Sequence, residues 1–554
     1  MNKYITSIIL SLLLLVIGGN ISFAQDSKLE ISRNLSIFNN LYKELHTNYV
    51  DTIDAKASIE TAINAMLYKL DPYNEYYDSD KAFKEFMTEE YAGIGSVHVL
   101  RDSVTYITSI VEGFPAHKAG LKIGDQIIAI NDTIVNKANI NDISNKIRGQ
   151  AGTNVKITVK RPYATDSIIS FNITREIIKP DILPYYGVIK ENIGYIALTS
   201  FKEDSYKRVK DALIELKKNP NIKAIVFDLR NNGGGLIDSS IDILSLFLPK
   251  NTEILQTRGR GGVIRDKYKT TNKPIDTKIP LAVLINEYSA SAAEVVAGSL
   301  QDLDRAVIIG KRSFGKGLVQ STVSCGNNTY LKVTTAKYYL PSGRLIQALD
   351  YSHRNADGSV APTPDSLTNV YHTANGREVR DGGGITPDIT IKDHKYSEFS
   401  INASNKRLIE DYATFFAAHH PSIPAPQDFV ITDSIYNDFK KFAHSRSFKY
   451  DKVSEKQIKA LRKTVEDNGY MNDSISAQLD ILENLLKHDL ETDLNKNRQE
   501  ISNLLSVSIT ERYYFSRGML INSFIFDPII DETAKTLLDS NKYSSILNPQ
   551  NSKK

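Results

Sequence analysis

The stretch IPLAVLINEYSASAAEVVAGSL, residues 279–300, decides the fold of this chain. It begins with an apolar run, Ile279 to Ile285, which has the length and composition of one buried strand. A short polar turn follows, after which apolar residues recur at helical spacing from Ala293 to Leu300. A buried strand that passes through a turn into a helix is the repeating unit of a parallel α/β sheet. The stretch therefore predicts an α/β core.

A second stretch repeats this pattern upstream. Ile222 to Leu229 is another apolar run, and it leads into the glycine-rich turn Asp228-Leu229-Arg230-Asn231-Asn232-Gly233-Gly234-Gly235. Glycines let a backbone approach another group closely and leave N–H groups to face an anion. The turn lacks the Gly-Lys-Ser/Thr of a phosphate-binding loop, so we expect no cofactor there. A turn with a purely structural role stays open as the alternative.

The remainder of the chain changes character at several points. Residues 28–82 carry apolar residues at helical spacing, and Leu70-Asp71-Pro72 ends the second helix because proline disfavours helical geometry in the preceding residue. From Tyr91 to Arg161 short apolar strands alternate with glycine and proline, and after residue 395 the chain is polar and helical. The predicted organisation is a multidomain α/β protein with an export signal at 1–24, a helical N-terminal segment at 25–82, a small β domain at 83–165, an α/β core at 166–395 and a helical C-terminal region at 396–554.

The first residues have the pattern of a cleavable export signal. Lys3 supplies a positive start, Ile5 to Ile17 is an almost unbroken apolar run, and Ser22-Phe23-Ala24 offers the small residues that a signal peptidase reads. We expect cleavage after Ala24 and an exported protein of the periplasm or cell envelope, and peripheral contact with the envelope stays open. An uncleaved membrane anchor is the open alternative, although the apolar run is short for a bilayer.

Composition removes several classes of protein. The formal net charge of the 554 residues is only +3, which gives no strong field for nucleic acid. Cys325 is the only cysteine, so the chain can form no internal disulfide and no cysteine-rich metal site. We expect neither a metal ion nor a nucleic-acid partner.

Two residues of the core could carry chemistry. Ser291 lies where a strand ends and a helix begins, and a helix N-terminus favours developing negative charge. Lys316 lies between two glycines amid apolar residues, where burial would favour the neutral amine that a general base needs. No histidine occurs between His117 and His353, so a serine–lysine pair, 25 residues apart, fits better than a triad with histidine. A helix cap at Ser291 and a surface turn at Lys316 are the plainer alternatives.

These motifs resemble those of the tail-specific, carboxyl-terminal processing serine proteases, over about residues 30–390. Two departures are modest: Gly233 replaces a proline often seen in the glycine-rich turn, and Ala293 replaces a frequent serine. The matching stretches are Leu70-Asp71-Pro72, the PDZ-like Gly93-Ile94-Gly95 and Pro115 to Asp125, the Asp228 to Asn232 turn, Ser289 to Glu294, and Phe314 to Gln320.

The resemblance implies a fold and a set of roles. The fold would comprise a helical N-terminal segment, a sandwich- or barrel-like PDZ domain, a peptidase core of the crotonase/ClpP type and a helical C-terminal region. Ser291 would be the nucleophile and Lys316 its base, with Gln320 orienting the lysine. The remaining expected roles are oxyanion binding by the N–H groups of Gly234 and Ala292, with Gly233 as an alternative, and capture of a peptide C-terminus by Gly93, Ile94 and Gly95.

The expected function is serine-type endopeptidase activity on exported proteins with free, apolar C-termini. The need for an activating or adaptor protein and the formation of a homo-oligomer stay open. A non-catalytic PDZ adaptor on a protease scaffold is the main alternative. An acyl-CoA enzyme of the crotonase type is disfavoured by the export signal, and a purely structural envelope protein leaves the Lys316 motif unexplained.

Overall fold

The computed structural model describes residues 28–80, 91–135, 139–351, 353–392, 394–450, 452–486 and 489–549. The predicted export signal lies outside these described residues. The chain divides into two compact units, one made of residues 1–78 with 322–333 and the other of the remainder. None of the helices within the described ranges has both the length and the apolar composition that crossing a membrane requires.

The first unit contains helices and the tip of a hairpin. Residues 28–48 are helical, and α2 (Ala55–Tyr68) begins after Asp54, whose carboxylate accepts a hydrogen bond from the Ala57 N–H. The helix ends before Pro72, which confirms the prediction from the Leu-Asp-Pro sequence. β1 (Glu75–Tyr77) follows and pairs antiparallel with residues 330–332 of β18 (Thr329–Tyr339).

Residues 91–178 form a small β domain around a core of their own. In β7 (Asn154–Lys160) every second side chain is buried, as expected for a strand with one face on the core. The domain continues past the boundary predicted at residue 165, because β8 pairs with β7 and β9 pairs with β2. The side chains of β8, a strand at the sheet edge, are mostly exposed and give a weak apolar signal. The other elements are β2 (Tyr91–Gly93), β3 (Ser96–Arg101), β4 (Val104–Ile110), α4 (Pro115–Ala119), β5 (Gln126–Ile130), β6 (Thr133–Ile134), α5 (Ile140–Ile147), β8 (Ile168–Thr174) and β9 (Glu176–Ile178).

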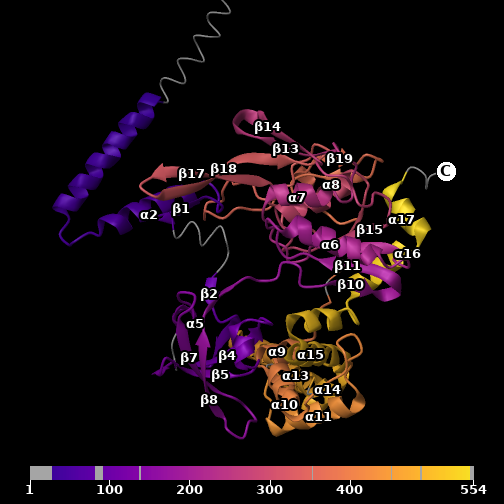
Figure 1. The fold of residues 1–554 in the computed structure, drawn as a ribbon. Coiled ribbons are helices and arrows are strands. Elements are labelled where there is room, and N and C mark those ends of the chain that lie inside the picture. The colour runs from indigo at the N-terminus through magenta and orange to yellow at the C-terminus, as the bar shows by residue number, and fades with distance from the viewer. Residues whose placement is uncertain are drawn as a thin grey trace, which may run out of the picture. The chain divides into compact units, whose positions relative to one another are not determined.

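A six-stranded sheet in the order β10-β11-β12-β15-β16-β21 forms the centre of the α/β core (Figure 1). All neighbours are parallel except β10 with β11. The four central strands are buried along their whole length, as parallel sheets covered on both faces require. The predicted strands at 222–229 and 279–285 are β12 and β15. The six strands are β10 (Tyr186–Ile189), β11 (Ile193–Ala197), β12 (Ala224–Asp228), β15 (Leu281–Ile285), β16 (Val307–Gly310) and β21 (Ile389–Thr390).

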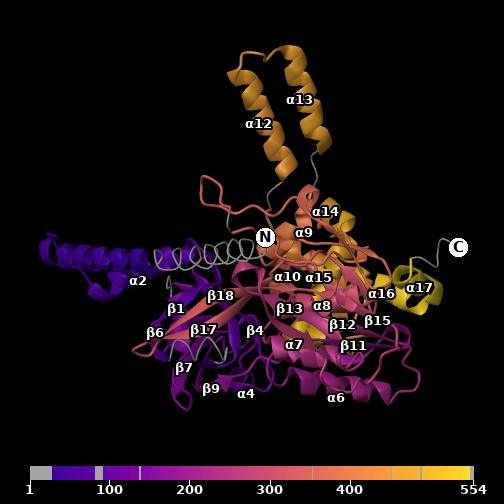
Figure 2. The ribbon, with the colours of Figure 1, turned by 90° about the horizontal axis from the view of Figure 1, so that it is seen from above.

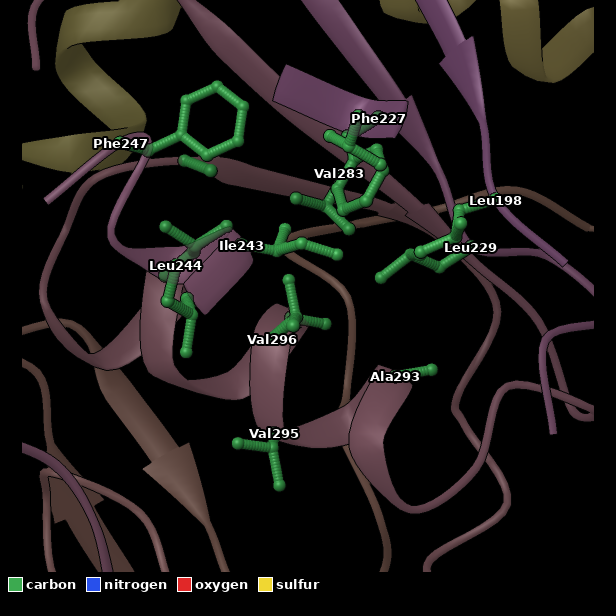
Figure 3. Close-up of a cluster of buried hydrophobic side chains, with 14 of the residues drawn as sticks. Leu198, Phe227, Leu229, Ile243, Leu244, Phe247, Val283, Ala293, Val295 and Val296 are labelled. Atoms are coloured by element: carbon green, nitrogen blue, oxygen red, sulfur yellow. The ribbon is translucent and has the colours of Figure 1, made fainter. Parts of the chain in front are cut away.

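Helices cover both faces of this sheet. On one face, α6 (Ser205–Lys217), α7 (Ile237–Leu244) and α8 (Ala292–Asp302) contribute to a continuous apolar cluster with the strands. Figure 3 shows part of it, where Val296 of α8 lies beside Ile243 and Leu244 of α7. The sequence predicted one apolar face for α8, but all of its residues are buried.

The opposite face is covered by the end of the chain. α16 (Pro528–Leu538) buries Ile530, Ala534 and Leu537 against strand residues such as Val226 and Leu284, and α17 (Ser540–Leu547) adds Leu547 to the same cluster. These helices belong by sequence to the region predicted at 396–554, yet they complete the core that was predicted to end at residue 395. The sequence prediction separated them because several hundred residues lie between strand and helix.

The other helices of the C-terminal region confirm the helical prediction. α12 and α13 run side by side as a hairpin (Figure 2), and Arg462 of α12 forms an ion pair with Asp480 of α13. The helices are α9 (Glu398–Asn405), α10 (Leu408–His419), α11 (Asp433–Ser445), α12 (Val453–Asp467), α13 (Asp473–Leu486), α14 (Leu490–Lys496) and α15 (Arg498–Ser523). A second sheet and a small hairpin consist of β13 (Glu253–Arg258), β14 (Ile264–Lys269), β17 (Leu318–Gly326), β19 (Val370–His372) and β20 (Glu378–Arg380), with β1 and β18.

Candidate active site

Three loops of the core meet at one edge of the six-stranded sheet. β12, β15 and β16 are parallel neighbours, so their carboxyl ends lie side by side. The glycine-rich turn follows β12, the turn to Ser291 follows β15, and the loop that carries Lys316 follows β16. The three stretches that the sequence analysis identified therefore lie together in the fold. They lie at the carboxyl edge of the sheet, where open α/β sheets bind their ligands.

Ser291 lies in the turn between β15 and α8 with a strained backbone. Its φ of 56° and ψ of −118° lie outside the regions that L residues favour, at a cost of about 1–3 kcal/mol. The turn is fixed from behind by Ser289, whose hydroxyl donates to the Leu229 carbonyl at 2.7 Å. A sharp strand-to-helix turn of this kind exposes its side chain at the top of a sheet, as it does for nucleophilic serines.

The carboxylate of Glu294 joins the Ser291 turn to the Lys316 loop. Its Oε2 accepts hydrogen bonds from the backbone N–H groups of Ser291 at 2.9 Å and Lys316 at 2.8 Å. Its Oε1 accepts from the Ser313 hydroxyl at 2.5 Å and the Gly315 N–H at 2.7 Å. Complete burial raises the pKa of this carboxyl to about 7, although the four donors lower it. One carboxylate therefore fixes the backbone of Ser291 relative to that of Lys316.

Lys316 is half-buried on a closely packed loop. Gly315 has a φ of 84°, and a Cβ on it would lie 2.4 Å from the Cβ of Ala348. A Cβ on Gly317 would lie 2.8 Å from the backbone nitrogen of Gln347, whose side-chain oxygen accepts a hydrogen bond from the Gly317 N–H at 2.7 Å. The two glycines beside the lysine are therefore required by packing and backbone conformation, which is why the Gly-Lys-Gly sequence carries a strong signal.

Gln320 has a different contact from the one predicted for it. It lies on β17, and its amide nitrogen donates to the Thr334 hydroxyl on the paired strand β18 at 3.2 Å. Its role in orienting Lys316 stays a prediction.

The glycine-rich turn lies directly against the turn that carries Ser291. The Asn232 carbonyl accepts a hydrogen bond from the Ala290 N–H at 2.9 Å. A Cβ added to Gly234 would lie 2.7 Å from the Ser291 Cβ, so only glycine allows this approach. Backbone groups of the glycine-rich turn are thereby placed beside the predicted nucleophile.

The N–H groups of this turn differ in their hydrogen bonding. The Gly234 N–H donates to the side-chain oxygen of Asn232 at 2.9 Å. Within the described residues, the N–H groups of Gly233 and Ala292 donate no hydrogen bond. The arrangement favours Gly233, the predicted alternative, over Gly234 as the partner of Ala292, and the oxyanion assignment stays a prediction.

The Gly93-Ile94-Gly95 loop joins β2 to β3, the edge strand of its sheet. The carbonyls of Ile94 and Gly95 accept hydrogen bonds from the Ala116 and Val111 N–H groups, which fix the loop. As far as the described chain extends, the N–H groups of Ile94 and Gly95 donate no hydrogen bond. Two such donors beside an open strand edge suit an extended peptide that ends in a carboxylate.

Comparison with known proteins identifies the family. Peptidase family S41 matches residues 192–351, a PDZ domain matches 106–161, and the description "Probable PDZ-protease, C-terminal helical domain" matches 389–537. A carboxy-terminal-processing protease of Bartonella bacilliformis is 34% identical over 351 residues, which are 62% of this chain and 80% of that relative. This chain belongs to the carboxy-terminal processing proteases. It is a serine peptidase of the S41 type with a PDZ domain, as the sequence motifs predicted.

A second relative agrees with this assignment. The carboxy-terminal processing protease CtpA of Bacillus subtilis is 34% identical over 350 residues, covering 62% of this chain and 73% of its own. Among solved structures, the photosystem II D1 C-terminal processing protease is 25% identical, covers 63% of this chain and 85% of its own, and has a TM-score of 0.37. A PDZ domain of a carboxy-terminal protease from Vibrio cholerae, solved in complex with a peptide, is 31% identical. It covers 16% of this chain and 99% of its own, with a TM-score of 0.16.

The sequence prediction gave no role to Glu294, although the residue ends the Ser289 to Glu294 motif. A signal was present: a glutamate three residues after a serine at a helix start is the spacing of a capping box. A glutamate among the apolar residues of the first two turns of a helix also requires a cluster of donors if the helix is buried.

Proposed function

We propose that this peptidase cuts peptide bonds with Ser291 as nucleophile and Lys316 as general base. The neutral lysine takes the hydroxyl proton as the serine oxygen attacks a peptide carbonyl, and the resulting ammonium returns the proton to the leaving amine. N–H groups of the glycine-rich turn and of Ala292 hold the oxyanion, where the loss of one donor typically costs about 10²–10³ in rate. Gln320 contributes by orienting the lysine.

A single observation carries this proposal. The Oε2 atom of Glu294 accepts a hydrogen bond from Ser291 and another from Lys316, with both distances below 3 Å. Two residues 25 positions apart are thus held by one buried atom at the edge of the sheet. The bond from Ser291 is also part of a capping box at the start of α8, so the bond from Lys316 is the one that a helix cap and a surface turn would not require.

The proposed substrates are proteins with a free, apolar C-terminus. The loop at Gly93, Ile94 and Gly95 would bind the terminal carboxylate while the peptide adds as a strand beside β3. Amidation of the substrate C-terminus should therefore weaken cleavage, and equal cleavage of both forms would contradict this part.

We further propose that the protein acts after export, with its N-terminus produced by cleavage after Ala24. N-terminal sequencing of protein recovered from the cell envelope tests this point. A sequence that begins at Gln25 is expected, and an N-terminus that still contains Lys3 would contradict it.

The catalytic assignment is tested with an unstructured protein that has an apolar free C-terminus. The wild-type protein should cleave it, and the Ser291→Ala and Lys316→Ala variants should both be inactive. Cleavage that survives both substitutions would contradict the dyad. Binding of the substrate by a wild-type protein that does not cleave it would instead favour the adaptor alternative.

A further inference from the structure

A buried cluster of charges lies directly behind the glycine-rich turn. Asp228 ends β12, and the Nε and Nη2 atoms of Arg230 donate to its carboxylate at 2.6 to 3.1 Å. The Tyr195 hydroxyl donates to the same carboxylate at 2.6 Å. The two charged side chains are 16% and 6% exposed, so water screens their attraction little. The cluster therefore fixes the first residues of the turn.

The last partner of this cluster comes from near the end of the chain. Nη1 of Arg230 donates to Oδ2 of Asp527 at 2.7 Å, and the Asp527 side chain is only 15% exposed. Asp527 is the N-cap of α16, where its Oδ1 accepts a hydrogen bond from the Ile529 N–H at 2.8 Å. One carboxylate thus caps a helix with one oxygen and binds the arginine of the glycine-rich turn with the other.

The place of Asp527 is set by the core itself. α16 packs on the six-stranded sheet through Ile530, Ala534 and Leu537, which are all buried. Burial works against the charge of Arg230, but Asp228 and Asp527 raise its pKa well above the ordinary value. The guanidinium is consequently a permanent charge held between the sheet and the C-terminal helices.

The cluster is connected to the chemistry through the turn. Gly233 lies three residues beyond Arg230, and the intervening Asn232 is hydrogen-bonded to Ala290 beside the nucleophile. Oxyanion donors act only when they lie about 2.7–3.1 Å from the developing charge. A shift of the turn by a fraction of this distance would weaken the donor at Gly233 and leave Ala292, Ser291 and Lys316 in place.

We propose that Asp527 is a positioning residue for the oxyanion turn and that it acts through Arg230. The C-terminal helices then complete the catalytic apparatus in addition to covering the sheet. This inference rests on the serine mechanism proposed above.

The test uses three variants of the full-length protein. Asp527→Asn removes the charge that faces Arg230 but keeps an oxygen for the helix cap, since asparagine caps helices as well as aspartate. Asp527→Glu keeps the charge and changes only its reach. Asp531→Asn is the matched control, because Asp531 lies one turn along α16 and forms an ion pair with Lys190, which precedes β11 and lies away from the glycine-rich turn.

Each variant is measured in three ways: kcat and KM on a peptide, the rate at which a fluorophosphonate labels Ser291, and Tm. For Asp527→Asn we expect kcat and the labelling rate, measured where the variant is folded, to fall together by about 10-fold, with KM within about twofold. Its Tm should fall only in part, because Asp228 still pairs with Arg230. Asp527→Glu should recover part of this loss, and Asp531→Asn should behave as wild type.

The outcomes separate the two proposals. A wild-type protein that is not labelled on Ser291 overturns the proposed function and this inference with it. Normal wild-type labelling with unchanged kcat in Asp527→Asn overturns this inference alone. So does a loss of kcat that the unfolded fraction at the assay temperature accounts for, that Asp531→Asn reproduces, or that Asp527→Glu does not relieve.

Discussion

The active site has a buried charge beneath its Ser291 and Lys316 loops and another beneath its glycine-rich turn, and the two charges are stabilised in opposite ways. Glu294 lies behind the Ser291 turn and the Lys316 loop, and four N–H and O–H donors surround it. In the part of the chain that the structure describes, no lysine or arginine forms an ion pair with it. Arg230 lies behind the oxyanion turn between two carboxylates. Stabilised by hydrogen bonds alone, Glu294 titrates near neutral pH, whereas Arg230 stays charged at every physiological pH.

The largest expected effect comes from breaking the arginine cluster. Arg230→Met should lower the free energy of unfolding by about 3–5 kcal/mol, because Asp228 and Asp527 would be left buried without a counter-charge. Chemical denaturation measures this loss. Arg312→Met is the control, since Arg312 follows β16 but forms an exposed ion pair with Asp365 and should unfold near the wild-type midpoint. Equal losses in the two variants would contradict the importance of burial.

Glu294→Gln should have the next largest effect on stability. An amide has one acceptor oxygen and one NH₂ group, so two of the four donors would face another donor in either orientation. Leaving two buried donors unsatisfied should cost about 2–4 kcal/mol, and peptidase activity should be lost. Denaturation and the cleavage assay measure both effects. Glu287→Gln, an exposed residue in the same turn, should change neither, and a harmless Glu294→Gln would show that the shared anchor is dispensable.

The same two groups differ in how well their surroundings could be predicted from the sequence. Ser291 and Lys316 lie in short motifs whose glycines and strand-to-helix turn are local, so their meeting at one sheet edge follows from β15 and β16 being neighbours. The burial of Glu294 is a weaker signal but still a local one. These features were accessible because each depends on residues a few positions apart.

Asp527 had no such signal. It lies 297 residues after Arg230. The apolar residues on both sides of it, at 524–526 and 529–530, indicate a buried helix start but not the strand or the arginine that it meets. The same separation explains why the core was predicted to end at residue 395, since a helix that covers a sheet face has an ordinary amphipathic pattern. Long-range pairing of two charges is set by the packing of α16 on the strands, which a single sequence does not reveal.

Glu294 should also make stability depend on pH. Burial raises its pKa from 4.5 in the unfolded chain to about 7 in the folded protein, so the folded state holds this proton more tightly. Its contribution is fully present below pH 4.5 and is lost as the pH rises through 7, by up to about 3 kcal/mol. Activity should change in the opposite sense, because the ionised carboxylate is the form that accepts four hydrogen bonds.

Unfolding midpoints across pH 4.5–8 would show this difference between wild type and Glu294→Gln. The pH-dependent loss should be smaller in the variant by the amount that the carboxyl contributes. If the midpoint depended on pH equally in the two proteins, a group other than Glu294 would be titrating. The contrast between a titratable Glu294 and a permanently charged Arg230 would then fail.

The smallest expected effect concerns the strain at Ser291, which belongs to the nucleophile side alone. Ala retains a Cβ and therefore the strain of the φ of 56°, whereas Gly releases it at some cost in chain entropy. Ser291→Gly should therefore be more stable than Ser291→Ala by about 1 kcal/mol, although both lack the nucleophile and are inactive. Their denaturation midpoints measure the difference directly. A more stable alanine variant would show that the turn is not strained. The free-energy cost of this active-site turn would then come from the burial of Glu294.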